Sequence, residues 1–182
     1  WIAPEMREDM GEIEASLTNE LPILIEPHQI KGALHNHTTA SDGAASLTEM
    51  ADAAIEMGWE YLGIADHSEI LNIGGRSIGV PQELVAEQGN EIRKMNEVWK
   101  DEGTNFRILH GSECDILPDG KLDYPDHIRR QFSHVVGSVH ALRSWNNRDE
   151  IENTENLIKA IEDPTFTILG HPTGRIIGGR DG

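Results

Sequence analysis

Short apolar segments rich in β-branched residues alternate along the chain with longer segments in which apolar residues recur at helical spacing. The short segments predict strands, because runs of this length and composition are typical of buried β-structure. Strands that alternate with helices favour an α/β fold, in which crossover helices join parallel strands. The strands are expected near 31–35, 60–65, 106–110, 134–139 and 166–170.

Three amphipathic helices are predicted between these strands. The first covers 46–58 and opens with a capping box, in which Ser46 is followed three residues later by Glu49. The second covers 81–103, with a proline suited to its first turn and a glycine at its end. The third covers 148–162 and is closed by a proline. Each predicted helix precedes a predicted strand.

The first 30 residues have a different pattern, because prolines and acidic residues are mixed with scattered apolar positions. This pattern favours an arm that follows a surface over a core element. We therefore expect residues 1–30 to be an N-terminal arm or interdomain linker. Residues 31–182 are expected to form one domain, which suits the total length of 182 residues. The start at Trp1 and Ile2 suggests a chain cut from a longer protein.

Composition narrows the possible classes of function. The chain has 15 Lys and Arg against 32 Asp and Glu, a formal net charge of -17, which disfavours generic attraction to nucleic acid or to an anionic membrane. The single cysteine, Cys114, excludes an intramolecular disulfide and a Cys-rich zinc module, and it is expected to fill the core. No membrane span or secretory signal is recognisable in the sequence. We therefore expect a soluble protein of the reducing cytoplasm.

Residues of the types that bind metal ions follow the predicted strands. The carboxyl ends of parallel strands lie on one edge of a sheet, so these side chains are expected to gather in one cup. Alternate strand residues share a face, which lets a His-x-His pair grip one ion while Asn36 turns away. Imidazole and carboxylate groups hold Zn, Mn or Fe ions, so the set predicts a catalytic metal cluster. Its members are His35, His37, His67, Glu113, His140 and His171.

Several nearby residues leave two interpretations open. Asp42 is either a further ligand or part of an Asp-Gly turn. Asp66 is either a ligand or a residue that orients His67 or the backbone. His110 lies three residues before Glu113 and would face the opposite side of an extended strand, which favours a structural role. Three other histidines are interpreted as surface or packing residues: His28, His127 and His134.

Basic residues near the predicted cup are candidates for substrate binding. Because the protein is strongly acidic, a phosphate-bearing substrate must be held locally, by metal ions or by a few arginines. Three arginines lie on glycine-rich loops that follow predicted ligands, where they either receive a phosphate or are ordinary solvated residues. They are Arg76, Arg175 and Arg180.

These segments together resemble the polymerase and histidinol phosphatase (PHP) domain superfamily. The similar motifs are LHNHTTASDG (34–43), GIADHSE (63–69), GSECDILPDGKLDYPD (111–126), SVHA (138–141) and ILGHPTGR (168–175). Within the superfamily, the chain is most similar to the carboxyl-terminal PHP domain of bacterial and archaeal X-family DNA polymerases. Its residues 7–26 resemble the linker that joins this domain to the polymerase module, so the resemblance covers essentially the whole chain.

The resemblance implies a PHP-type distorted (βα)7 barrel with two to three divalent metal ions, Mn, Zn or Fe, at the carboxyl ends of its strands. It assigns one ion to His35, His37 and Glu113, a second to Glu113, His140 and His171, and a third to Asp42 and His67. Glu113 would thus bridge two ions. The five residues that hold the first two ions are implied to be catalytic.

Two departures from the family pattern are visible. The last family motif, Asp-x-His, is absent because the chain stops at Gly182, so two ions would each lack one ligand and the barrel would lack its last strands. Ala33 stands where the family usually has an aspartate before the first His-x-His pair. An alanine removes a partner that would orient a histidine, which is expected to lower metal affinity.

By this resemblance the chain is a metal-dependent phosphoesterase, most closely a 3′–5′ exonuclease that acts on DNA 3′ ends in DNA repair. A polymerase module in the same protein would supply most of the affinity for DNA. Two alternatives stay open: a small-molecule phosphomonoesterase of the histidinol-phosphatase type, and a catalytically silent PHP module that serves as a scaffold. A module that binds nucleic acid alone is disfavoured, because aromatic residues are only 5% of the chain and no basic stripe is present.

Overall fold

The computed structural model describes residues 1–73, 76–140, 145 and 148–173. The chain divides into two compact units, Trp1–Ile30 and Lys31–Gly182. The first unit contains two short 3-10 helices, η1 (Pro4–Met6) and η2 (Pro27–Gln29), and the helix α1 (Glu12–Thr18), none of which buries a residue. The segment interpreted as an arm therefore contains a helix that its sequence pattern did not indicate.

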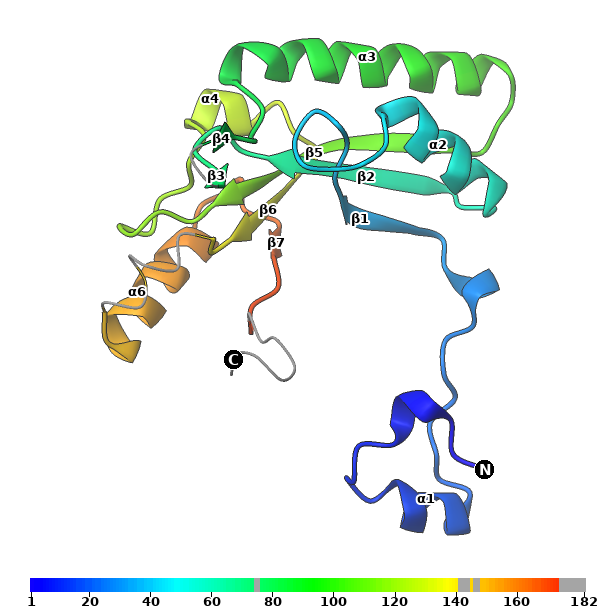
Figure 1. Ribbon diagram of the computed structural model, residues 1–182. Coiled ribbons are helices and arrows are strands. Elements are labelled where there is room, and N and C mark those ends of the chain that lie inside the picture. Colours follow the sequence, from blue (N-terminus) through cyan, green and yellow to red (C-terminus); the bar gives the residue numbers. More distant parts are fainter. Residues whose placement is uncertain (74–75, 141–144, 146–147, 174–182) are drawn as a thin grey trace. The chain divides into compact units, whose positions relative to one another are not determined.

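The second unit is built on a sheet of five parallel strands in the order β1-β2-β5-β6-β7. The sheet curls into a half-barrel (Figure 1). A separate antiparallel hairpin, β3 (Asn72–Ile73) and β4 (Arg76–Ser77), follows β2. The parallel α/β fold predicted from the alternating pattern is confirmed. The strands of the main sheet are β1 (Gly32–Asn36), β2 (Tyr61–His67), β5 (Arg107–Asp115), β6 (His134–Ser138) and β7 (Ile168–Leu169).

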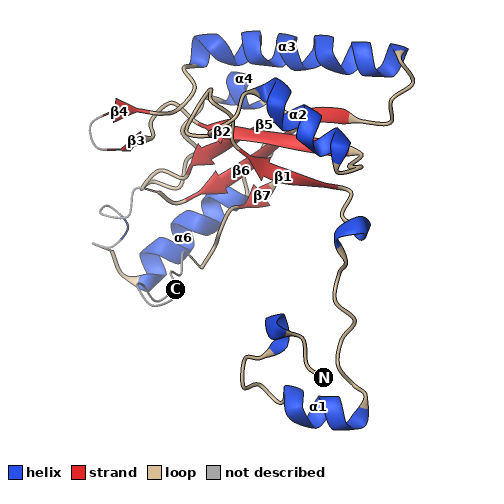
Figure 2. Cartoon of the chain, turned by 45° about the vertical axis from the view of Figure 1, so that its right-hand side comes forward, coloured by secondary structure: helices blue, strands red, loops and turns tan. Residues whose placement is uncertain are grey.

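Helices connect these strands, and α2 and α3 lie along one face of the sheet (Figure 1 and Figure 2). The three predicted helices are confirmed, and so is the capping box of α2, in which the Glu49 amide donates to Oγ of Ser46. The short helix α4 and the β3–β4 hairpin were not predicted, because neither is long enough to show a hydrophobic period. Among the described residues, no helix is long and apolar enough to cross a membrane. The helices that the structure describes in this unit are α2 (Leu47–Glu56), α3 (Gln82–Asp101), α4 (Asp126–Arg129) and α6 (Glu150–Ile161).

Two apolar clusters hold the helices against the sheet. In one of them, Leu47 and Ala51 of α2 pack with Leu62 and Ile64 of β2. Full burial of a leucine or isoleucine side chain contributes roughly 1.5–3 kcal/mol to stability. The other cluster contains Cys114, which is fully buried, and burial raises the pKa of its thiol to about 12. The predicted core role of Cys114 is confirmed, and its thiol is inert at neutral pH.

The central strand β5 extends to Asp115, well beyond the predicted segment 106–110. His110 packs on the side of β5 that faces α3, where a Cβ atom at Gly89 would lie 2.9 Å from its ring. This close approach explains a glycine in the middle of a helix. Nε2 of His110 lies 3.2 Å from Oε1 of Gln88 in the same helix. His110 is therefore a packing residue on the face opposite to Glu113.

The buried state of His110 generates a prediction about pH. Burial lowers the pKa of His110 from 6.5 to about 4, so between these values the unfolded chain binds a proton that the folded chain does not. Stability attributable to this group is therefore lost as the pH falls through that window. As the pH falls from about 7 to about 4.5, the free energy of unfolding is expected to fall in the wild type by roughly 2 kcal/mol more than in the variant His110→Asn. Urea unfolding of both proteins at the two pH values measures this difference. Equal losses in the two proteins would contradict this assignment.

Strand β1 is irregular at the point where it carries the His-x-His pair. Two of its residues, Leu34 and His35, stand opposite the single residue Gly63 of β2. A Cβ atom at Gly63 would lie 2.7 Å from the Cα atom of Leu34. An extra residue in one strand bends it and changes the direction of the side chains that follow. The missing side chain at Gly63 thus lets the backbone of β1 approach closely and sets the direction of the histidine pair.

We predict that Gly63→Ala lowers the free energy of unfolding by roughly 1–3 kcal/mol, because backbone atoms cannot yield to the added methyl group as a side chain would. Affinity for Mn²⁺ is expected to fall with it, since the histidines of β1 shift. Urea unfolding and isothermal titration measure the two effects. Glu60→Ala is the control, since it removes only an exposed ion pair with Lys31 and should change neither quantity. Wild-type stability of Gly63→Ala would contradict the close approach.

Candidate metal centre

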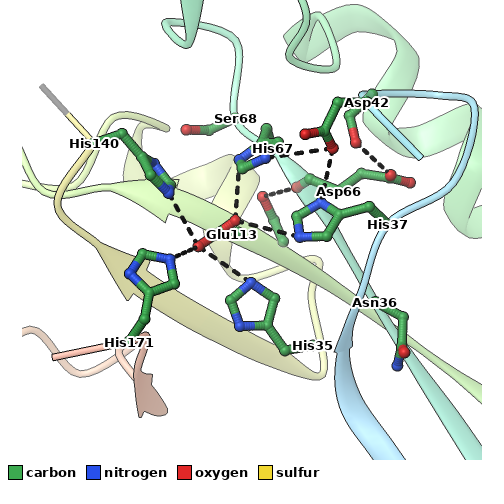
Figure 3. Close-up of polar contacts among 12 residues, drawn as sticks. His35, Asn36, His37, Asp42, Asp66, His67, Ser68, Glu113, His140 and His171 are labelled. Carbon is green, nitrogen blue, oxygen red and sulfur yellow. Dashed lines mark hydrogen bonds and ion pairs between the residues drawn. The ribbon is translucent and has the colours of Figure 1, made fainter. Parts of the chain in front are cut away.

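Glu113 of β5 lies at the centre of a cluster of histidines (Figure 3). The residue is 1% exposed, so its carboxylate needs partners that offset the loss of hydration. Oε1 faces three Nε2 atoms: that of His35 at 3.1 Å, that of His140 at 3.3 Å and that of His171 at 2.8 Å. One carboxylate oxygen therefore joins side chains from β1 and from the segments that follow β6 and β7.

The second oxygen, Oε2, faces two histidines that also approach Asp42. It lies 3.4 Å from Nε2 of His37 and 3.0 Å from Nδ1 of His67. Oδ1 of Asp42 lies 3.5 Å from the other ring nitrogen of each, Nδ1 of His37 and Nε2 of His67. Two carboxylates thus hold two imidazoles between them. Asp42 also belongs to an Asp-Gly turn, and a Cβ atom at Gly43 would lie 2.4 Å from the His37 carbonyl oxygen.

The cluster follows from the sheet topology. Parallel strands place their carboxyl ends on one edge, and each strand of the main sheet delivers at least one member of the cluster from its carboxyl-terminal half or from the residues just after it. Asn36 turns away, and its amide donates to the carbonyl oxygen of Gly63 at 2.9 Å (Figure 3). The structure brings all seven candidate ligands together, while their binding of metal stays a prediction. They are His35, His37, Asp42, His67, Glu113, His140 and His171.

Within the described part of the chain, three groups of side chains each place ligand atoms within 4.8 Å of one another. They are His35, His37 and Glu113; His37, Asp42 and His67; and His67, Glu113 and His140. The first group equals a set that the family resemblance implies. The second adds His37 to the implied pair of Asp42 and His67. The third contains His67 in place of His171, which contacts Glu113 but belongs to none of the three groups.

Two ring nitrogens of the cluster are better explained by a cation than by hydrogen bonding. Nδ1 of His37 and Nδ1 of His67 are buried and have no hydrogen-bond partner among the described residues, although a carboxylate oxygen lies within 3.5 Å of each. A buried polar atom left without a partner costs about 1–3 kcal/mol. A cation between nitrogen and oxygen would remove this cost. The combination of imidazole and carboxylate donors suits Zn, Mn or Fe.

The protonation states also suit metal binding. Burial raises the pKa of Glu113, but hydrogen bonds with His140 and His35 outweigh it and hold the pKa well below its usual range. Burial lowers the pKa of His67 and favours the neutral imidazole, which is the form that binds a metal. Burial lowers the pKa of His140 too, but hydrogen bonds with Asp115 and Glu113 outweigh it and raise the pKa to about 9. A metal that binds His140 must therefore displace a proton.

Two aspartates near the cluster support it without joining the three groups. Asp115 is buried, and its Oδ1 lies 2.9 Å from Nδ1 of His140, whose Nε2 points to Glu113. Asp115 was not predicted as a site residue, although its position two residues after Glu113 places both on one side of β5. Asp66, whose role was left open, accepts a hydrogen bond from the backbone amide of Thr38 and so orients the loop after β1.

The arginines proposed from the sequence are not members of the described cluster contacts, and the remaining histidine has a packing role. Arg76 is in β4, whereas Arg175 and Arg180 lie outside the part of the chain that the structure describes. Nε2 of His134 lies 2.8 Å from a backbone carbonyl oxygen of β1, which is a packing role. Ala33 lies in β1 and provides no polar side chain to orient a histidine.

The fold and the cluster together define a parallel α/β domain with a candidate centre for several metal ions. Residues 33–180 match the PHP domain family, and the chain belongs to this family. Its curled parallel sheet is accordingly that of a PHP-type α/β barrel. The family resemblance expected from the sequence motifs is confirmed.

Individual relatives carry two kinds of name. The chain is 42% identical over 181 residues to the Bacillus subtilis protein named "DNA polymerase/3'-5' exonuclease PolX". This alignment covers 100% of the chain and 30% of the Bacillus subtilis protein. It is 30% identical over 141 residues to a "Probable phosphatase" of Clostridium acetobutylicum, in an alignment that covers 76% of this chain and 52% of that protein. A "Probable phosphatase" of Caldanaerobacter subterraneus is 34% identical over 140 residues, 76% of this chain and 50% of that protein. The chain thus spans 30% to 52% of the length of these relatives.

We predict that Asp115→Asn lowers metal affinity by roughly 10–100-fold, because His140 loses the charged acceptor that fixes its ring. Titration of the metal-free chain with Zn²⁺, followed by calorimetry, measures the change. Asp119→Asn is the matched control, since Asp119 is an exposed residue of the next turn that pairs with Lys121. If Asp115→Asn binds as tightly as the control, Asp115 does not support the centre.

Proposed function

We propose that this chain is a metal-dependent phosphoesterase and, more specifically, the 3′–5′ exonuclease PHP domain of an X-family DNA polymerase. The observation that carries the proposal is the buried Glu113 carboxylate, enclosed by five histidines at the carboxyl edge of the sheet. The specific activity is supported by the 42% identity over 181 residues to the Bacillus subtilis protein, whose name includes a 3'-5' exonuclease.

The proposed centre takes two to three divalent ions of Mn, Zn or Fe. Such ions, when bound, supply Lewis-acid polarisation of a phosphate ester and lower the pKa of nearby water to near 7. Glu113 belongs to two of the three groups, so its carboxylate would help to hold two of the ions. Asp115 keeps the Nε2 edge of His140 turned toward Glu113. The proposed catalytic set is His35, His37, Glu113, His140 and His171, with Asp42 and His67 as further ligands.

Substrate binding is proposed to combine local and distant contacts. Arg76, Arg175 and Arg180 are the candidates to contact the substrate phosphate. Because the net charge is -17, the domain would depend on a polymerase module of the same protein for most of its DNA affinity. The 30% coverage of the Bacillus subtilis relative supports such a module. A role in DNA repair in the cytoplasm belongs to the same proposal.

A second candidate is a small-molecule phosphomonoesterase of the histidinol-phosphatase type. The similarity to the two proteins named "Probable phosphatase", at 30% and 34% identity, favours it. Both candidates use the same metal centre, so the cluster itself does not separate them. The substrate does, because an exonuclease cleaves a phosphodiester at a strand end and a phosphatase cleaves a terminal phosphomonoester.

Nucleotide release from DNA tests the proposal directly. The chain, loaded with Mn²⁺, is expected to release mononucleotides from the 3′ end of a linear single strand and to leave a circular single strand intact. We predict that the double variant His35→Ala, His37→Ala lowers this release by more than about 100-fold, because two ligands of one group are lost. The matched control is His28→Ala, His127→Ala, which changes two histidines outside the three groups and should keep full activity.

Other outcomes assign the chain differently. Turnover of p-nitrophenyl phosphate without nucleotide release would favour the phosphomonoesterase. Release that survives the His35→Ala, His37→Ala double variant would place the activity elsewhere. Bound metal without turnover of either substrate would contradict both enzymes and favour a catalytically silent scaffold.

A further inference from the structure

The carboxylate of Asp66 is buried among neutral hydrogen-bond donors. The residue is 2% exposed. Oδ1 accepts from the amide of Thr38 at 2.7 Å and from Oγ of Ser41 at 2.6 Å. Oδ2 accepts from Oγ1 of Thr38 at 2.8 Å and from Nε2 of Gln88 at 2.7 Å. With two donors on each oxygen, Asp66 has its acceptor sites filled and is not free to bind a metal.

Three of these four donors belong to the loop that follows β1. Inside this loop the carbonyl oxygen of Thr38 accepts from the amides of Ser41 and Gly43, at 3.1 and 2.9 Å. The loop is closed so tightly that a side chain at Gly43 would collide with the backbone of the preceding histidine. Asp66 therefore holds this compact turn at two points, at Thr38 where the turn begins and at Ser41 three residues later.

The residue that this turn presents to the cluster is Asp42. Its Oδ1 lies 3.5 Å from ring nitrogens of both His37 and His67. Successive residues of a strand point to opposite faces, so His67 enters the cluster while Asp66, its neighbour in β2, holds the turn. One strand end thus places two members of the same metal group, His67 directly and Asp42 through the hydrogen bonds of Asp66.

We propose that Asp66 is a positioning residue that controls metal binding at one group of the centre, the group of His37, Asp42 and His67. This inference rests on the proposed metal centre and goes beyond it by assigning separate support to separate ions. The group of His67, Glu113 and His140 is supported by Asp115, as described above. The hydrogen bonds of the Asp66 carboxylate reach none of Glu113, His35 or His140.

An outer contact extends this support to helix α3. Gln88 donates to Asp66 through Nε2, and its Oε1 lies 3.2 Å from Nε2 of His110. His110 is itself packed against the helix at Gly89. The amide of Gln88 is therefore held in one orientation, with its donor toward the carboxylate. Gln88→Ala removes one donor of four and is expected to have a smaller effect than a change of Asp66.

The test compares Asp66→Asn with Asp115→Asn by metal titration. Asn has the shape of Asp, but its amide nitrogen would face donors, so the turn loses hydrogen bonds on one side. We expect Asp66→Asn to weaken Mn²⁺ binding at the group of His37, Asp42 and His67 by about 10–100-fold. Binding at the group that Asp115 supports is expected to stay within about 2-fold of the wild type. Asp115→Asn is expected to weaken Mn²⁺ binding at the group of His67, Glu113 and His140 instead. Bound metal per chain, counted by mass spectrometry after dialysis, gives an independent readout.

A double-mutant cycle separates positioning from general stability. Asp66 acts through Asp42, so Asp66→Asn should cost no further affinity in a chain that already carries Asp42→Ala. Additive losses, or equal losses at every site, would overturn the proposal. If Asp66→Asn does not fold, Thr38→Val and Thr38→Ser replace it: loss of the same site class with Val and retention with Ser supports the proposal, and equal binding by both overturns it.

The outcomes also separate this inference from the proposed function. A wild-type chain that binds no divalent metal would overturn the proposed function and this inference with it. A wild-type chain that binds metal, together with a folded Asp66→Asn chain that binds it equally well, would overturn the inference alone.

Discussion

A carboxylate as deeply buried as that of Glu113, at 1% exposure, loses hydration worth several kcal/mol, and the surrounding elements must supply groups that compensate for it. Five imidazoles, from strands β1 and β2 and from the segments that follow β1, β6 and β7, converge on its two oxygens. Without a cation this compensation is partial, since two buried ring nitrogens lack hydrogen-bond partners among the described residues. Divalent ions would satisfy the carboxylate and the imidazoles together. The sheet, its register and its supporting aspartates are arranged around this requirement.

The parts of this arrangement that depend on local sequence could be predicted. The capping box at Ser46 and the alternation of strands and helices are encoded within a few residues, and the ligand candidates follow from the rule that parallel strands end on one edge. The pairs that support the cluster could not be predicted in the same way. Asp66 meets Thr38 across 28 residues of sequence, and His140 meets Asp115 across 25. Such partners are set by strand order and register, which a hydrophobic pattern does not specify.

The extent of β5 shows the same limit. Its apolar pattern ends near His110, but the strand continues to Asp115 because β2 and β6 pair with it on both sides. That extension places Glu113 within regular structure, where its direction is fixed by two neighbouring strands. The need for glycine at position 63 could not be predicted either, because it arises from the backbone of β1, which packs directly against Gly63 in the structure. The carboxylate of Glu113 is therefore held more rigidly than one on a loop would be, which suits a ligand that must keep its position.

Anomalous X-ray scattering from crystals of the chain grown with Zn²⁺ would show whether the Glu113 cluster is a metal centre. We expect anomalous peaks at the absorption edge of zinc, about 2.0–2.2 Å from the oxygens of Glu113 and from the facing imidazole nitrogens. Peaks confined to exposed acidic residues, with none beside Glu113, would contradict this assignment.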